Sequence, residues 1–295
     1  MLREPSHTLG RLGATALLLA ALACRDTAAP KLDSRAILFQ VQNALYAISP
    51  DGTGQQQITD GTHFDGYGVW SPNGSRIAFT SNRGGQAGLY TMRPDGSDVT
   101  AITTPAAFGG AYMLSWSSKN VLAYSFVTSQ GGNLLTIPAS GGTPFSLQAD
   151  HVVATGDWSP DGNRIAFEST RDGDTSHVFV INADGTGLTE IAKVSGAGEG
   201  APSWSPDGRH IAFMRAFVGG GGIWVVDADG SNPVQVTTRS GDAYPAWSPD
   251  GSRIVFTSTR DGPGDLYILN VDGSNMQRLT TTGMYPAGTK WRRVQ

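Results

Sequence analysis

Short runs of apolar residues recur along most of the chain, separated by segments rich in glycine, serine and aspartate. The first run of each pair is RIAF at 76–79, VLAY at 121–124, RIAF at 164–167, HIAF at 210–213 and RIVF at 253–256. The second run is LYTM at 89–92, LLTI at 134–137, VFVI at 178–181, IWVV at 223–226 and LYIL at 266–269. Such runs, punctuated by Asp-Gly turns, are typical of short antiparallel strands joined by tight hairpins. The pattern predicts an all-β fold.

These strands lack the alternation of apolar and polar side chains that a sheet with one solvated face shows. Ile77, Ala78 and Phe79 are consecutive and all apolar. An uninterrupted apolar strand is expected where both faces of its sheet are covered. We therefore expect each sheet to pack against a neighbour on either side.

A tryptophan-headed phrase precedes each pair of runs. WSPDG stands at 158–162, 204–208 and 247–251, WSPNG at 70–74, and degenerate copies begin at Trp116 and Trp291. Six of the seven tryptophans thus share one frame, at intervals of 42 to 46 residues. Four short strands in a repeat of about 40–45 residues form the blade of a β-propeller.

The two ends of the chain carry complementary parts of one further repeat. RAILF at 35–39 and the segment 44–59 supply its last three strands, and KWRRV at 290–294 supplies its first. Pairing of the C-terminal strand with the first blade closes the ring and removes the exposed edges of an open sheet. With five complete repeats between them, the sequence predicts six blades of four antiparallel strands over residues 35–295.

The segment WSPDGSRIVFTSTRDGPGDLYILNVDGSNMQRLT at 247–280 combines all of these motifs. It resembles, nearly position by position, the repeat of TolB-type six-bladed propellers, and the resemblance covers about residues 35–295. It implies the fold but little about function, because propellers carry many functions. TolB proteins have an additional N-terminal α/β domain. We expect this chain to lack that domain, because only residues 25–34 separate its leader from the first strand.

Residues 1–24 have the features of a secretion signal. Arg3 and Arg11 precede the apolar stretch LGATALLLAALA at 12–23, which is too short to span a bilayer as a permanent helix. This stretch ends at Cys24, the one cysteine of the chain. An ordinary cleaved signal with an incidental cysteine is the alternative to a lipoprotein signal.

LLLAALAC resembles the lipobox of bacterial lipoproteins, in which the final cysteine receives a diacylglycerol group. The resemblance implies that Cys24 is lipidated and that residues 25–34 tether the propeller to a membrane. Arg25 follows the cysteine where an aspartate would favour the inner membrane. We therefore expect a monomer in the bacterial cell envelope, at the outer membrane and attached to it through the lipid alone.

Composition and motifs argue against several other classes of protein. The net charge of −4 and the lack of a basic run argue against a nucleic-acid partner. No Gly-x-Ser-x-Gly nucleophile motif occurs, and no histidine shows a metal-ligand spacing. We expect no cofactor and no metal. Arg83, Arg171 and Arg260 repeat in register, which predicts salt bridges from blade to blade.

The candidate site lies in the segments that lead into the first strand of each blade. Five positions before the tryptophans stand Asp65, Ala111, Val153, Glu199, Asp242 and Pro286. Acids at three of six equivalent places predict a partly negative rim at the channel mouth. His63, Asp150, His151 and Asp157 lie in the same set of segments. Such a rim could bind a cation, a basic side chain or a sugar; alternatively, the acids cap turns by accepting backbone N–H bonds.

The sequence leaves three functions open. The first is a non-catalytic, lipid-anchored scaffold that presents its loops to a protein or peptide of the envelope. The second is an enzyme or carbohydrate-binding propeller that uses the channel-mouth acids, of the glycan or peptide lyase or hydrolase type. The third is a passive structural or sensory domain. The absence of a complete catalytic set favours the first.

Overall fold

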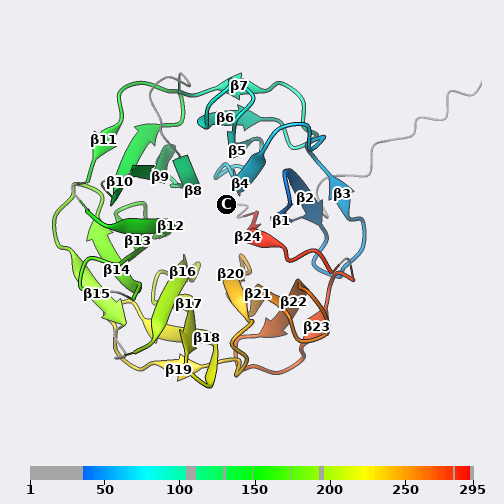
Figure 1. Ribbon diagram of the computed structural model, residues 1–295, viewed down its shortest axis with the longest axis vertical. Helices are drawn as coiled ribbons and strands as arrows, with labels where there is room; N and C mark the ends of the chain where they lie inside the picture. The colour runs from blue at the N-terminus through cyan, green and yellow to red at the C-terminus, as the bar shows by residue number, and fades with distance from the viewer. Residues whose placement is uncertain are drawn as a thin grey trace, which may run out of the picture. The chain divides into compact units, whose positions relative to one another are not determined.

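The computed structural model describes residues 36–103, 111–128, 131–147, 149–173, 175–192, 196–281 and 283–292. These residues belong to one compact unit, residues 31–295, and form 24 strands in six four-stranded sheets. The sheets are arranged as blades around a central channel (Figure 1). Within this part of the chain no helix is long and apolar enough to cross a membrane. The predicted six-bladed, all-β propeller is confirmed.

Each blade places one strand at the channel and three progressively farther out (Figure 1). Blade 1 contains β24 (Ala287–Trp291), β1 (Ile37–Val41), β2 (Ala44–Ile48) and β3 (Gln56–Gln57). Blade 2 contains β4 (Asp65–Trp70), β5 (Ile77–Ser81), β6 (Gly88–Met92) and β7 (Thr100–Ala101). Blade 3 contains β8 (Ala111–Trp116), β9 (Val121–Thr128), β10 (Gly131–Pro138) and β11 (Phe145–Ser146).

The remaining three blades repeat this order. Blade 4 contains β12 (Val152–Trp158), β13 (Arg164–Ser169), β14 (His177–Asn182) and β15 (Thr189–Ala192). Blade 5 contains β16 (Gly198–Trp204), β17 (His210–Phe217), β18 (Gly220–Asp227) and β19 (Val234–Gln235). Blade 6 contains β20 (Ala243–Trp247), β21 (Arg253–Ser258), β22 (Asp265–Asn270) and β23 (Gln277–Arg278).

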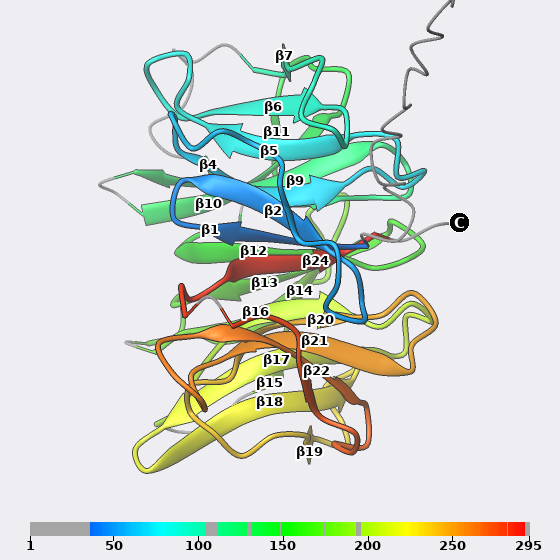
Figure 2. The ribbon, with the colours of Figure 1, turned by 90° about the vertical axis from the view of Figure 1, so that its right-hand side faces the viewer.

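The C-terminal strand closes the ring, as the sequence predicts. β24 pairs antiparallel with β1, with Ile37 opposite Trp291 and Leu38 opposite Lys290. Figure 2 shows the red β24 lying beside the dark blue β1. The strand begins at Ala287, earlier than the predicted segment 290–294, of which residues 293–294 lie outside the described part. Because β24 covers the inner edge of β1, blade 1 has its full complement of four strands.

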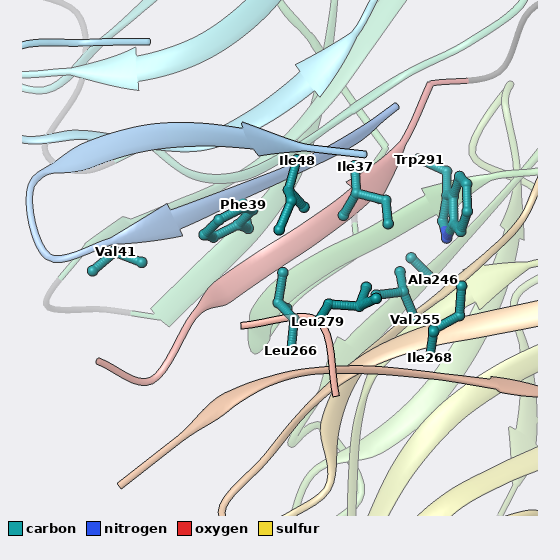
Figure 3. Close-up of a cluster of buried hydrophobic side chains, with 10 residues drawn as sticks. All are labelled: Ile37, Phe39, Val41, Ile48, Ala246, Val255, Leu266, Ile268, Leu279 and Trp291. Atoms are coloured by element: carbon teal, nitrogen blue, oxygen red, sulfur yellow. The ribbon is translucent and has the colours of Figure 1, made fainter. Parts of the chain in front are cut away.

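The hydrophobic core lies between neighbouring blades. In the cluster between blades 1 and 6, Ile37, Phe39 and Trp291 pack against side chains of β21 and β22 (Figure 3). Similar buried clusters join the other neighbouring blades. Both faces of each blade are thus covered, which explains the uninterrupted apolar strands.

The Trp-Ser-Pro-Asp-Gly phrase combines packing with a self-contained turn. In blade 4 the hydroxyl of Ser159 donates to the Asp161 carboxylate at 2.5 Å, and the backbone N–H of Asn163 donates to the same oxygen at 3.0 Å. Gly162 has φ 65°, a conformation that glycine adopts at no steric cost. The tryptophan that heads the phrase is buried between blades. The phrase recurs because every blade needs the same turn.

Cationic side chains connect the blades through the tryptophans. The guanidinium of Arg164 in blade 4 lies 4.6 Å from the ring centroid of Trp204 in blade 5. His210, which replaces the arginine in blade 5, stacks on Trp247 of blade 6 with ring centroids 6.3 Å apart. The predicted blade-to-blade salt bridges of Arg83, Arg171 and Arg260 are wrong: their carboxylate partners Asp65, Asp150 and Asp242 precede strands of the same blade or begin them.

Candidate functional site

The two ends of the channel are built from different parts of the repeat. Each inner strand begins after the connection from the preceding blade. It ends at the Trp-Ser-Pro turn. We call the end that carries these turns the Trp end. We call the other the loop end; it carries the segments leading into the inner strands and the hairpins between second and third strands. In Figure 2 the loop end is on the left and the Trp end on the right.

The Trp end encloses a cavity of about 240 Å³ to which all six blades contribute. Its wall repeats tryptophan, serine and proline side chains, among them Trp70, Ser71, Pro72, Trp158, Ser159, Pro160, Pro206, Trp247 and Pro249. A uniform wall of this kind reflects the repeat that builds the ring.

A lysine that lines this cavity crosses the channel. The ammonium Nζ of Lys290 on β24 donates to the backbone oxygen of Gly156 on β12 at 2.7 Å. Blades 1 and 4 are opposite one another in the ring, so this bond spans the channel. Beside Gly156, the buried carboxylate of Asp157 accepts from the hydroxyl of Ser115 and the backbone N–H of Trp204. The polar groups at this depth therefore hold blades together.

The acids predicted to form a rim at the loop end are buried ion pairs. Both oxygens of Asp65 accept from Nη2 of Arg83 at 2.9 Å, and Asp242 and Arg260 repeat the same geometry. The side chains of Asp65 and Asp242 are fully buried. Arginines from the same blades cover and neutralise these two carboxylates, so Asp65 and Asp242 do not supply free negative charge to the partly negative rim that the sequence predicted. Ligand binding at this end of the channel stays a prediction.

Glu199 has a different set of partners. Arg215 donates to its Oε1 at 2.8 Å, and Nδ1 of the buried His177 lies 3.5 Å from its Oε2. Burial raises the pKa of the Glu199 carboxyl, and the arginine and histidine oppose that shift. Arg215 stands in β17 itself, two positions before the place that Arg83 occupies in blade 2. Blade 5 has Phe217 at the position where blade 2 has Arg83. This difference in the sequence indicates that the arginine partner of Glu199 comes from another position.

The two candidate histidines lie on separate, exposed segments of the loop end. Nδ1 of His63 is 3.0 Å from the hydroxyl of Thr62, in the segment before β4. Nδ1 of His151 is 3.6 Å from the carboxylate of Asp150, just before β12. Within the described ranges, the structure brings no three His, Cys, Asp or Glu side chains into a geometry that could hold a metal ion. Cys24 lies outside the described residues.

Tyrosines that the sequence analysis did not consider lie at the loop end of the channel. Tyr67 and Tyr244 stand three positions before their tryptophans, at β-bulges, each with φ 53°. The rings of Tyr244 and Tyr285 meet edge to face with centroids 6.4 Å apart. Burial raises the pKa of the Tyr244 phenol, and Tyr285, Tyr67 and Glu168 lie close enough to raise it further. Tyr244 and Tyr285 therefore form an aromatic pair, and Tyr67 and Glu168 act on the same phenol.

Tyr285 itself and four other exposed apolar side chains lie on loop-end segments of the ring. Phe217 and Val218 stand at the tip of the β17–β18 hairpin, Val153 follows the first residue of β12, and Met284 and Tyr285 precede β24. Val218 is fully exposed and the other four are 40% to 45% exposed. Exposed apolar residues at one end of a protein are candidates for contact with a partner.

The sequence and the fold both match known propellers. Residues 144–293 match the family model described as "TolB beta propeller domain". The chain is 30% identical over 146 residues to "Protein TolB homolog" of Chlorobium luteolum, an alignment covering 49% of this chain and 32% of that protein. It is 30% identical over 84 residues to "Dipeptidyl-peptidase 5" of Porphyromonas endodontalis, covering 28% and 12% of the two chains. The chain thus spans about a third or less of the length of these curated relatives.

Solved structures agree with this assignment at the level of the fold. TolB from Acinetobacter baumannii superposes with a TM-score of 0.77 at 19% identity, covering 88% of this chain and 67% of that one. An oligogalacturonate lyase in complex with manganese superposes with a TM-score of 0.59 at 17% identity, covering 80% and 70%. The same architecture therefore serves proteins of different activity. With half of its length matched by the family model, the chain belongs to the TolB beta-propeller domain family.

Proposed function

We propose that this chain is a lipid-anchored protein of the bacterial cell envelope whose propeller binds a protein or peptide partner at the loop end. The observation that carries the proposal is the group of exposed apolar side chains at that end, Val153, Phe217, Val218, Met284 and Tyr285. Solvent contact with such side chains is unfavourable, and a partner that covers them gains the corresponding free energy.

The β17–β18 hairpin is the part of this surface best placed to meet a partner. Its strands are eight residues long, whereas β5 and β6 have five each. Figure 2 shows the hairpin extending beyond neighbouring strands at the loop end. Apolar side chains at the tip of a protruding hairpin can enter a complementary groove with little rearrangement of the ring.

The buried ion pairs favour binding over acid–base chemistry. Both oxygens of Asp65 and of Asp242 already accept bonds from an arginine. A general acid or base needs an oxygen within reach of the substrate. These pairs instead stiffen the loop ends of blades 2 and 6.

Membrane attachment completes the proposal. The lipobox-like sequence ending at Cys24 supports a diacylglyceryl anchor at the outer membrane, and residues 25–34 would tether a single copy of the propeller to it. A tethered propeller searches for its partner near the membrane surface, which raises the effective concentration of the two.

Site-specific photo-crosslinking in the native envelope tests the proposal. A benzoylphenylalanine is placed at Val218 on the loop end and, as a matched control, at the exposed Val234 on the outer strand β19. We expect one discrete crosslinked protein from Val218, weakened by Phe217→Asp, and none from Val234. Equal crosslinking at both positions, or none at Val218, would contradict binding at the loop end.

A further inference from the structure

Glu168 is a carboxylate in an unusual position, on the second strand of blade 4 where it meets the inner strand of blade 5. Its Oε2 accepts from the backbone N–H of Ala201 at 3.3 Å, and the nearby Ser176 hydroxyl lowers the pKa of the carboxyl. A Cβ atom at Gly200 would lie 2.2 Å from the same oxygen, so only glycine leaves room for the carboxylate there. The residue is therefore held firmly beside the channel-lining bulge of blade 5.

The hydrogen bond that Glu168 makes does not require a charge. Gln40 occupies the equivalent place in blade 1, and its Oε1 accepts from the backbone N–H of Tyr67 in blade 2 at 3.2 Å. Gly66 leaves room for that amide as Gly200 does for the carboxylate. Since a neutral amide serves the same structural purpose one half-turn around the ring, the negative charge of Glu168 needs another explanation.

Glu168, which is partly buried, also lacks what the fully buried acids at this end possess. Asp65, Asp242 and Glu199 each face an arginine. In the part of the chain that the structure describes, burial, Ser176 and Ala201 act on the Glu168 carboxyl and no cationic side chain does. Burial raises the pKa of this carboxyl, which is the cost of keeping a carboxylate from water without a counter-charge.

The tyrosines stand at the same level of the ring as this carboxylate. Glu168 bonds to Ala201 at the bulge of blade 5, and Tyr67 and Tyr244 stand at the equivalent bulges of blades 2 and 6. Tyr285 contacts Tyr244 edge to face.

Tyr67 and Tyr244 keep a left-handed backbone conformation, with φ 53°, that is unfavourable for a residue with a side chain. At the same place in blade 1 the chain has Gly288, with φ 60°, which avoids that cost. Ala201 has φ 49° at the same place in blade 5, so the conformation belongs to the bulge, and the aromatic rings are what distinguish blades 2 and 6.

We propose that Tyr67, Tyr244, Tyr285 and Glu168 form a binding site for a basic side chain, lysine or arginine, presented by the partner. Aromatic faces attract organic cations, and a single carboxylate supplies the opposite charge. A hard metal ion would instead require several oxygen ligands. This inference rests on the proposed function, because it identifies the group of the partner that enters the channel.

The site can be tested without the partner, by NMR of the full chain labelled in its tyrosine rings. The probes are the peptides acetyl-Gly-Lys-Gly-amide and acetyl-Gly-Arg-Gly-amide, with the uncharged acetyl-Gly-norleucine-Gly-amide for comparison. We expect the two charged peptides to shift the ring signals of Tyr67, Tyr244 and Tyr285, and the norleucine peptide to leave them in place.

Glu168→Gln should weaken binding of the charged peptides by about tenfold or more, because it removes the opposite charge but keeps the acceptor for Ala201. Asp229→Asn is the matched control: it removes one charge from an exposed turn at the Trp end and should leave the affinity unchanged. Equal affinity in Glu168→Gln, or equal shifts with norleucine, would overturn the site. If the charged peptides bind as expected but Val218 gives no crosslink, the loop-end docking surface is rejected and the binding site for a basic side chain is not.

Discussion

The two ends of the channel differ in how closely they follow the repeat. At the Trp end all six blades contribute to one cavity wall in which tryptophan, serine and proline recur. At the loop end, equivalent positions carry Asp65 in blade 2, Val153 in blade 4 and Glu199 in blade 5. At the Trp end every blade needs the same packing and the same turn, so the residues repeat. At the loop end the fold does not require identical residues, so they can differ from blade to blade and contribute to recognition.

Removal of the closing strand should have the largest effect. Deletion of residues 286–295 removes β24 and exposes Ile37 and Phe39 of blade 1. We expect loss of about 5 kcal/mol or more of the unfolding free energy, comparable with the whole stability of a typical domain. Thermal unfolding followed by circular dichroism measures this. A truncated protein that melts like the full chain would show that closure contributes little.

A pair of aromatic truncations compares the two ends directly. Trp204 at the Trp end is fully buried, whereas Phe217 at the loop end is 42% exposed. Trp204→Ala should lower the unfolding free energy by about 3–5 kcal/mol, and Phe217→Ala by under about 1 kcal/mol. Urea unfolding of both variants measures the difference. Similar losses in the two would mean that the loop end is as much a part of the core as the Trp end.

Substitutions in the buried ion pairs of the loop end should lower the unfolding free energy nearly as much as substitutions in the hydrophobic core. Asp242→Asn leaves Arg260 buried without its carboxylate and should cost about 3–5 kcal/mol. Asp272→Asn, on an exposed turn of the Trp end, keeps an acceptor for Ser274 and should cost under about 1 kcal/mol. If Asp242→Asn folds as stably as Asp272→Asn, the charge of the pair contributes nothing to the ring.

Two carboxyl groups should give opposite pH dependences. The hydroxyl of Ser248 and the N–H of Ser252 lower the pKa of Asp250, at the Trp end, to about 2. Its contribution is present above the unfolded value of 3.8 and is lost as pH falls through about 2, so Asp250→Asn is less stable than the wild type near pH 6.

Burial raises the pKa of Glu168 above 4.5, so its contribution is present below pH 4.5 and is lost as pH rises through the folded-state value. Glu168→Gln should therefore gain stability over the wild type near pH 7 and lose that gain near pH 4. Unfolding of both variants at several pH values measures these differences. A stability loss at pH 7 in Glu168→Gln would mean that the carboxylate has a counter-charge after all.

Substitution of Cys24 should have the smallest effect on the stability of the ring and a large effect on the location of the protein in the cell. Cys24→Ala should leave the unfolding of the ring unchanged and move the protein from the membrane fraction to the soluble fraction. Mass spectrometry of the wild-type protein should find a diacylglyceryl adduct on an N-terminus at Cys24. A mature chain that begins elsewhere without lipid would reject the anchor.

Much of the fold is readable from residues that recur at fixed intervals. The frame of Trp70, Trp158, Trp204 and Trp247 predicted the blades, and the incomplete repeats at the two ends predicted closure. The partners of the loop-end acids were not predictable in the same way. Arg215 reaches Glu199 across neighbouring strands of one sheet, and His177 does so from the preceding blade, contacts that depend on strand register and blade packing.

The sequence by itself determined the blade, because local turn chemistry and apolar patterning act over a few residues and repeat in every copy. It also determined which residues are identical from blade to blade and which differ. Only the tertiary structure decided that Asp65 and Asp242 are covered by arginines of their own blades while Glu168 bonds to the bulge of the next blade. The reason is that strand register sets the contacts within a blade and blade packing sets those between blades, so the charge and exposure of each group follow from neighbours that are distant in the chain.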